Sequence, residues 1–330
     1  MKQPYLLFLG NAKDQLAAKT AQGVADWRPE WCVGQLRLEN CKADVGLPDM
    51  NITAAVSHGA QSLVIGVVNP GGVINPDWTP VLVEALEAGM DIVSGLHSPL
   101  SDNKDLAEVA ARQGCKLIDV RIPDQELGTG TGVKRTGKRL LTVGTDCSLG
   151  KKYTALALEK EMRAQGLDAD FCATGQTGVM IAGRGLAIDA VVADFISGAA
   201  EWISPDADES HWHVIEGQGS LFHPSFAGVS LGLLHGSQPD ALVLCHEPTR
   251  THMRNVPGHP IPDLQECMDL NIAAARLTNK SAKFVGISVN SSELDDEARK
   301  KYMAETEDRY GLPCGDPMIE GMGKIVENLS

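Results

Sequence analysis

One segment constrains the fold of this chain more than any other: a short apolar run followed by a glycine-bounded loop and a helical pattern. The run Leu140–Val143 predicts a buried strand, residues 144–150 predict a loop, and Tyr153–Arg163 predicts a helix. A strand, a loop and a helix in this order direct backbone N–H groups and a helix N-terminus toward one point, where they stabilise phosphate charge. The segment therefore predicts an α/β domain with a phosphate-binding loop of the P-loop kind.

The loop reads Gly144-Thr-Asp-Cys-Ser-Leu-Gly-Lys-Lys152 and departs from the standard P-loop in two ways. Five residues rather than four separate its two glycines, and Lys152 stands where Ser or Thr would place a hydroxyl on Mg²⁺. An ammonium group has donors only, so it cannot ligate Mg²⁺, but it can pair with phosphate oxygens. Lys152 therefore favours coenzyme A over metal-chelated ATP, unless Thr145, Ser148 or Thr154 supplies the hydroxyl.

We expect this loop, hereafter the 144–152 loop, to hold the cofactor, with Lys151 as the mobile cation that reaches the phosphates. The alternative is a Gly-rich turn that binds nothing. The residues expected to contact the cofactor are Gly144, Ser148, Leu149, Gly150, Lys151, Lys152 and Tyr153.

Short apolar runs bounded by Gly, Pro, Asn or Asp recur along the 330 residues, separated by helical patterns, which predicts repeated βα units. Low aromatic content (5%) with 34 glycines suits parallel sheets built from Val, Ile, Leu and Ala. Between residues 122 and 139 the composition changes to Pro, Gly, Thr and clustered Lys and Arg. We predict an α/β protein with a small doubly wound domain (1–125), a linker (126–138) and a P-loop domain (139–330). In the first domain the expected strands are 5–9, 62–68, 91–94 and 116–120, and the expected helices 14–26, 80–88 and 103–113.

The net charge of −14 excludes some partners. It would repel nucleic acid and anionic lipid, so we expect neither a nucleic-acid nor a membrane partner, and we expect a local cationic pocket for any anionic ligand.

The run Tyr5–Leu9 is too short for a signal peptide, and no apolar run approaches the roughly 20 residues of a spanning helix, which predicts a cytoplasmic protein. The eight cysteines form no CxxC pair and are expected to be reduced thiols, and His246 and His252 lack a Cys/His/carboxylate zinc pattern, so no metal site is predicted. The cations Lys134, Arg135, Lys138 and Arg139 are expected to be solvated.

Candidate bases follow a second predicted strand. Residues from Trp212 run into Glu216 and a Gly-x-Gly turn, which would expose the carboxylate at the sheet edge that carries the 144–152 loop. Glu216 could act as a base if burial raises its pKa toward neutrality. His223 is a second candidate, because an imidazole needs little perturbation to work near pH 7. Either residue could instead cap the turn.

Two further segments supply polar candidates for an acidic substrate. A strand ending near Cys172 leads into a predicted Gly-rich loop with Gln176, Thr177 and Arg184, and Arg184 could grip a carboxylate with two parallel hydrogen bonds. His246 and Arg250 follow another apolar run, at the strand end where ligands of open parallel sheets bind. Arg250 is the second candidate for an acidic substrate.

Two resemblances connect these segments. The longer loop that begins Gly-Thr-Asp, the Glu-Gly-x-Gly turn and a late strand that ends in Asn290 resemble dethiobiotin synthetase, in which the Asn reads adenine and the carboxylate serves a metal. More specifically, GTDCSLGKKYTA, ATGQTGVMIAGRGLAIDAVVADFISGAAEW, EGQGSLFHPS and CHEPTRTHMRN resemble the D-glutamate N-acetyltransferase family over nearly the full length. This second resemblance implies a Rossmann-like N-terminal domain, a P-loop NTPase-like C-terminal domain, and acetyl transfer from acetyl-CoA to the amine of D-glutamate in D-amino-acid catabolism.

Under that resemblance, Lys151 and Lys152 would hold the coenzyme A phosphates, Arg184 and Arg250 would hold the two carboxylates, and Glu216 or His223 would take a proton from the substrate ammonium. Backbone N–H groups of a Gly-rich loop could stabilise the oxyanion.

Two other functional classes stay open. One is a Mg-ATP-dependent ligase or kinase of the dethiobiotin synthetase type, with Asp146 and Glu216 on Mg²⁺. The other is a regulatory nucleotide-binding module without turnover. In each case a homo-oligomer is the default expectation, because paired α/β subunits are common.

Overall fold

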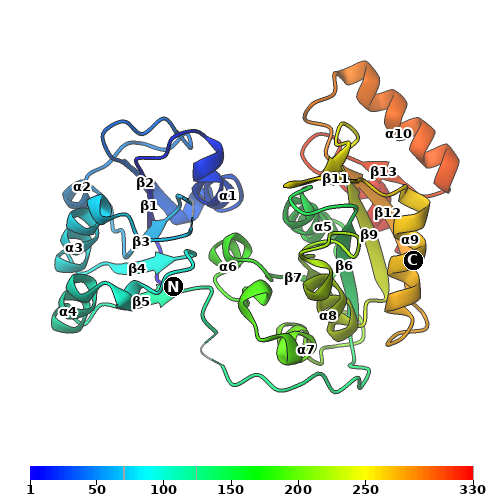
Figure 1. Cartoon of the computed structure of the whole chain (residues 1–330), viewed down its shortest axis with the longest axis horizontal. Coiled ribbons are helices and arrows are strands. Elements are labelled where there is room, and N and C mark those ends of the chain that lie inside the picture. Colours follow the sequence, from blue (N-terminus) through cyan, green and yellow to red (C-terminus); the bar gives the residue numbers. More distant parts are fainter. Residues whose placement is uncertain (70, 124, 330) are drawn as a thin grey trace. The chain divides into compact units, whose positions relative to one another are not determined.

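The computed structural model describes residues 1–69, 71–123 and 125–329. The chain divides into two compact units, one formed by Met1–Asp124 with Val179–Ala187 and the other by Gln125–Gly178 with Ile188–Ser330 (Figure 1). Each unit contains a parallel sheet connected by helices, so the predicted α/β class is confirmed.

The first unit contains a five-stranded sheet in the order β2-β1-β3-β4-β5. Its first strand is buried along its whole length, which is why the run that begins at Tyr5 is continuously apolar rather than alternating. Every strand pair in the sheet is parallel. The strands are β1 (Tyr5–Gly10), β2 (Cys32–Arg37), β3 (Ser62–Ile65), β4 (Asp91–Ser94) and β5 (Leu117–Asp119), and the helices are α1 (Lys19–Trp27), α2 (Ile52–Ser57), α3 (Thr79–Glu87) and α4 (Lys104–Gln113).

The second unit contains a six-stranded parallel sheet in the order β13-β12-β9-β6-β8-β7 and a small antiparallel pair, β10 with β11. β6 lies between β9 and β8, so the carboxyl ends of these three strands are neighbours at one edge. The strands are β6 (Lys138–Gly144), β7 (Ala169–Cys172), β8 (Trp212–Ile215), β9 (Ala241–His246), β10 (His252–Met253), β11 (Val256–Pro260), β12 (Lys283–Val289) and β13 (Cys314–Gly315). The helices are α5 (Lys151–Ala164), α6 (Gln176–Ala182), α7 (Ile196–Ile203), α8 (Ala227–Ser237), α9 (Leu264–Ala275), α10 (Asp296–Tyr310) and α11 (Gly323–Glu327).

Two expectations from the sequence are wrong. The Gly-rich stretch after β7, which was expected to be a loop, contains the helix α6, and Gly175 and Gly178 permit close packing against Gln218 and Glu216. The basic residues between 134 and 139 are not uniformly solvated, because Arg139, which lies in β6, is fully buried. Its guanidinium donates to backbone carbonyls, among them those of Ser204 at 3.0 Å and Pro205 at 2.8 Å, which satisfies the buried charge without a carboxylate.

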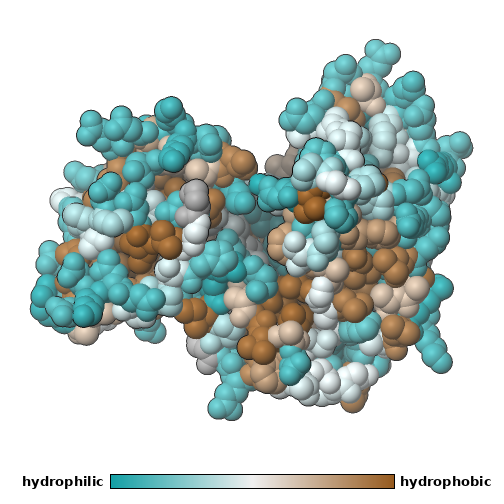
Figure 2. Space-filling model, in the orientation of Figure 1, coloured by the Kyte–Doolittle hydropathy of each residue, from teal (hydrophilic) through white to brown (hydrophobic). Residues whose placement is uncertain are grey.

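The face shown in Figure 2 carries apolar surface over α7 and α8. Trp202 on α7 and Leu231 on α8 are among the exposed apolar side chains, at 45% and 40% exposure. The homo-oligomer stays a prediction. Within the described part of the chain, no helix combines the length and apolar character needed to cross a bilayer.

Candidate functional site

The 144–152 loop follows β6 and leads directly into α5, as the sequence predicts. Gly150 caps α5 in a left-handed conformation (φ 103°) and provides no side chain for the helix N-terminus, and Ser148 is also left-handed (φ 53°). Among the described residues, the backbone N–H groups of Ser148, Leu149, Gly150 and Lys151 meet no hydrogen-bond acceptor. An unoccupied row of N–H groups at the start of a 14-residue helix is an anion-binding arrangement.

Lys151 brings a cation into the same loop. Its side chain is 5% exposed, and its Nζ donates to the backbone carbonyl of Asp146 at 2.7 Å. Burial lowers the pKa of this ammonium group below its ordinary value. A phosphate on the neighbouring N–H groups would stabilise the charged form of Lys151, which burial disfavours.

Asp146 is a fully buried carboxylate that holds the loop together. Its Oδ1 accepts from the N–H of Cys147 at 2.7 Å, and its Oδ2 accepts from Arg250 Nη1 at 2.9 Å and from the N–H of Arg254 at 2.8 Å. Burial alone would raise the pKa of Asp146, but these hydrogen bonds outweigh it and hold the pKa below its ordinary range. Both carboxylate oxygens are thus engaged by protein donors, and a Mg²⁺ ion would have to displace them.

The terminal nitrogens of Arg250 donate most of their hydrogen bonds to the 144–152 loop. Besides its bond to Asp146, Nη1 donates to the carbonyl of Cys147 at 2.7 Å, while Nη2 donates to Glu247 Oε2 at 2.6 Å and to the carbonyl of Ser148 at 3.3 Å. The pKa of Arg250 is raised, because hydrogen bonds to two carboxylates outweigh its partial burial. Four bonds from one fork make Arg250 a clamp on the loop backbone.

His223 is brought beside this clamp from the turn after β8. One ligand atom each of Asp146, Cys147 and His223 lie within 4.8 Å of one another, which is the spacing of a metal site. However, His223 Nδ1 accepts from the N–H of Ser225 at 3.2 Å, so Nε2 carries the proton and donates it to the carbonyl of Arg254 at 3.1 Å. Both nitrogens are therefore engaged, and a metal or a proton would have to break one of these bonds.

Glu216 directly follows β8 and is 4% exposed. Its Oε2 accepts from the N–H groups of Thr174 at 3.0 Å and Gly175 at 3.1 Å, whereas its Oε1 has no hydrogen-bond partner in the described residues. Burial raises the pKa of Glu216 above its ordinary value, and the opposing effects of Lys152, the two N–H groups and Lys151 do not cancel it. A buried carboxylate with one fixed and one open oxygen is suited to accept a proton.

Two glycines make this placement possible. A Cβ on Gly217 would lie 1.6 Å from the carbonyl oxygen of Thr142, and a Cβ on Gly178 would lie 2.2 Å from Glu216 Oε2. The N–H of Gly217 also donates to Thr142 Oγ1 at 2.8 Å. The turn after β8 is therefore pressed against β6, which places Glu216 at the sheet edge that carries the 144–152 loop.

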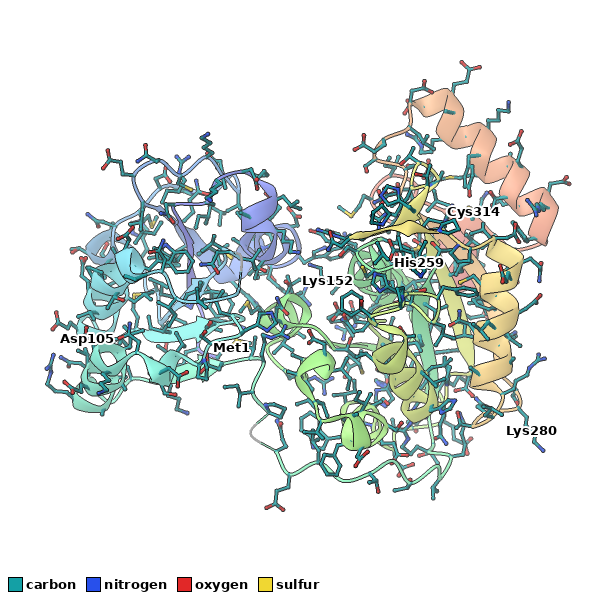
Figure 3. The ribbon with its side chains drawn as sticks, viewed as in Figure 1. Met1, Asp105, Lys152, His259, Lys280 and Cys314 are labelled. Atoms are coloured by element: carbon teal, nitrogen blue, oxygen red, sulfur yellow. The ribbon has the colours of Figure 1, made fainter. Side chains whose placement is uncertain are left out.

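The remaining cofactor candidates lie at the same edge. Lys152 is in the first turn of α5 (Figure 3), with its ammonium group 4.8 Å from the centre of the Tyr153 ring, and its charge acts on Glu216. Asn290 follows β12, donates its N–H to the carbonyl of His246 at 2.8 Å, and accepts from the N–H of Ser292 at 3.3 Å.

The substrate candidates divide between the units. His246 ends β9 beside the loop, with its Nδ1 3.1 Å from Thr145 Oγ1, and burial lowers its pKa to about 4. Gln176 and Thr177 begin α6 in the second unit, directly after the segment that binds Glu216. Arg184 belongs to Val179–Ala187, which groups with the first unit. The fold of the second unit therefore does not by itself place Arg184 at the 144–152 loop.

The sequence analysis missed two threonines that organise the site. Thr142, inside β6, accepts from Gly217, and Thr174 Oγ1 donates to the carbonyl of Glu216 at 2.5 Å. Thr142 is the one polar residue in the apolar run that predicted β6. A hydroxyl in a buried strand needs a partner, and that requirement is a signal that could have found it.

The second unit is thus a P-loop-type α/β domain with its functional groups at the carboxyl ends of β6, β8 and β9. Residues 126–326 match a family described as a domain of unknown function, the DUF1611 P-loop domain, and residues 33–123 match the Rossmann-like domain of the same family. The chain belongs to the DUF1611 family.

Relatives extend over the whole chain. A D-glutamate N-acetyltransferase from Tritonibacter scottomollicae is 53% identical over 330 residues, covering 100% of this chain and 99% of its own, and one from Pseudoalteromonas sp is 53% identical over 329 residues with the same coverage. The crystal structure of a DUF1611 family protein from Anabaena variabilis is 34% identical, with a TM-score of 0.87 and 99% of each chain covered. The resemblance to this family read from the sequence motifs is confirmed.

Proposed function

We propose that this protein transfers the acetyl group of acetyl-CoA to the amine of D-glutamate, in D-amino-acid catabolism. The full-length identity of 53% to two proteins named for this activity supports the reaction. One observation in this chain carries the proposal. A loop with free N–H groups for a phosphate lies at the same sheet edge as Glu216, a buried carboxylate with a raised pKa.

The coenzyme is assigned to the 144–152 loop. The N–H groups of Ser148 to Lys151 would receive phosphate oxygens, and the ammonium groups of Lys151 and Lys152 would neutralise their charge. Asn290 remains a candidate for the adenine by its place at the end of β12. Lys152 occupies the position of a metal-binding hydroxyl. Its positive charge would stabilise the negative charge of the Glu216 carboxylate, as Mg²⁺ does in metal-dependent P-loop enzymes.

Glu216 is assigned as the general base. Its open Oε1 takes a proton from the substrate ammonium, and the freed amine attacks the thioester carbonyl carbon. The C–N bond forms as the carbonyl becomes an oxyanion, which backbone N–H groups stabilise; the C–S bond then breaks and the thiolate leaves. As the amide forms, its nitrogen loses the second proton and the thiolate takes it up to give free coenzyme A, while Glu216 returns the first proton to solvent.

Recognition of the acidic substrate is assigned to Arg184, Gln176, Thr177 and His246. Arg184 supplies the planar fork that matches a carboxylate. For Arg250, the four bonds to the loop and its flanking carboxylates favour a role in holding the loop over direct contact with the substrate. His223, with both nitrogens engaged, is likewise better suited to positioning the turn after β8 than to accepting a proton.

A Mg-ATP-dependent ligase or kinase fits this site less well. That reading needs Asp146 and Glu216 on Mg²⁺, but Asp146 is taken by Arg250 and two N–H groups, and Lys152 places a positive charge where the metal would be. We further propose that the protein acts in the cytoplasm as a homo-oligomer.

The reaction is tested by mixing the purified protein with acetyl-CoA and D-glutamate and measuring free thiol together with the mass of the amino-acid product. We expect stoichiometric thiol and N-acetylglutamate without added Mg²⁺ or ATP. Turnover that requires ATP and Mg²⁺ would contradict the proposal.

A further inference from the structure

The second unit contains a cavity next to the 144–152 loop, and His246 is the one residue of its lining that the proposed function assigns to a ligand. Its volume is about 370 Å³, within the usual range of small-molecule sites. His246 forms part of its wall, and the Nδ1 of the same ring contacts Thr145 in the loop at 3.1 Å. One side chain, His246, therefore contacts both the loop and the cavity.

Three aromatic side chains, those of His246, Tyr302 and Tyr310, line the cavity. The rings of His246 and Tyr302 are inclined by 26° with centres 6.2 Å apart, and Tyr310 lies further along α10 with the guanidinium of Arg309 5.0 Å from its ring centre. Because burial lowers the pKa of His246 to about 4, this ring is neutral near pH 7. Near-parallel aromatic faces and a guanidinium plane are surfaces on which a planar base stacks.

The charges of the cavity determine which part of a ligand it accepts. Asp263 and Glu305 line it together with Arg309, which is bound to Asp263 Oδ2 at 3.2 Å, and Glu305 Oε1 lies 3.9 Å from the ammonium group of Lys301 on the same helix. The second oxygen of Asp263 caps α9 by accepting from the N–H of Gln265 at 2.8 Å. Because these charges are already paired, the described lining offers no unpaired cation to phosphate groups or to the carboxylates of an acidic substrate, and its carboxylates can accept from the amino group of an uncharged ring.

We propose that this cavity binds the adenine ring of the coenzyme, stacked against Tyr302, while the phosphates lie on the 144–152 loop. The inference rests on the proposed function for the identity of the ligand, but it concerns binding rather than turnover. It places the base beside His246 and α10 instead of at Asn290, whose carbonyl oxygen Oδ1 is occupied by the N–H of Ser292.

The test compares two ligands that differ by the adenine nucleotide portion. Coenzyme A and 4′-phosphopantetheine are titrated calorimetrically into the wild-type protein, Tyr302→Ala, Tyr302→Phe and the control Lys300→Ala. Lys300 is exposed on the same helix and does not line the cavity. Loss of one stacking surface should weaken coenzyme A about tenfold in Tyr302→Ala. Tyr302→Phe keeps the ring and should bind like the wild type, as should Lys300→Ala, and the affinity for 4′-phosphopantetheine should not change in any variant.

Equal weakening of both ligands in Tyr302→Ala, or unchanged affinity for coenzyme A, would overturn the adenine site. A wild-type protein that binds neither coenzyme A nor ADP would overturn it as well. Failure of the proposed function gives a different result, in which coenzyme A binds and depends on Tyr302 but no thiol is released with D-glutamate.

Discussion

Replacing Arg250 by Ala removes the clamp on the 144–152 loop and leaves Asp146 buried with two backbone N–H donors. Removing one partner of a buried ion pair typically costs ~3–5 kcal/mol, because the other charge is left without compensation. The guanidinium is 17% exposed and Asp146 keeps its N–H bonds to Cys147 and Arg254, so we expect about 3 kcal/mol. For a folding unit of about 200 residues, the size of the second unit, that corresponds to a fall in Tm of roughly 6–12 °C.

The assay is thermal unfolding of the full chain with Arg276→Ala as the control. Arg276 is exposed, and its Nη2 donates a hydrogen bond to the carbonyl of Ala282 at 3.3 Å. Its replacement should change stability by no more than about 0.5 kcal/mol. Arg250→Lys should fall between the two variants, since an ammonium group keeps the charge but cannot make the forked contacts.

The pH dependence gives a second readout of the same clamp. The pKa of Asp146 is lowered in the folded state, so the stability that it contributes is fully present above its unfolded pKa of about 3.9 and is lost as pH falls through the lower folded value. The stability difference between wild type and Arg250→Ala should therefore be largest near neutral pH and shrink in acid. If Arg250→Ala keeps the wild-type Tm and acid profile while only the KM for D-glutamate rises, Arg250 binds the substrate and the clamp is refuted.

Two further predictions concern the turn after β8. Gly217→Ala places a Cβ 1.6 Å from the Thr142 carbonyl, so it should destabilise the protein by at least about 3 kcal/mol. The control Gly228→Ala, whose Cβ meets nothing within 4 Å in α8, should be neutral or stabilising by up to about 1 kcal/mol. Equal Tm values for the two variants would contradict the close approach of Gly217 to Thr142. Glu216→Gln should lower kcat about 10²–10⁴-fold with folding retained, and the wild-type rate should fall as pH drops through the raised pKa of Glu216, above the ordinary Glu value of about 4.3. An acid limb that persists unchanged in Glu216→Gln would assign the base to another residue.

The sequence predicted those parts of the fold whose signal is local. β1 is buried along its whole length and appears as an apolar run between turn residues, and most of β6 is buried and contains the run Leu140–Val143, in which Thr142 is the one polar residue. β2 was missed because it is an edge strand of mixed polarity, with Gln35 buried and Arg37 exposed. Membership of an edge strand depends on pairing with distant residues, which a local pattern does not encode.

The candidate site shows the same division. The order of β6, loop and α5 and the place of Glu216 after β8 follow from local pattern, and the structure has both. The use of Arg250 as a clamp could not be predicted, because it depends on three carbonyl or carboxylate partners more than 100 positions away in sequence and one nearby. Likewise, the glycines around α6 have the local pattern of a loop. Gly178 is needed there for its close approach to the Glu216 carboxylate, which the local pattern does not encode.

The most direct test of the account is free-thiol release from acetyl-CoA with D-glutamate, L-glutamate and a panel of other D- and L-amino acids, in the wild type and in Glu216→Gln. The account predicts rapid release with D-glutamate, little with the L-enantiomer, no requirement for Mg²⁺ or ATP, and loss of the D-glutamate signal in Glu216→Gln. Absence of thiol release with D-glutamate from a folded protein that binds coenzyme A, or release that is unchanged in Glu216→Gln, would contradict it.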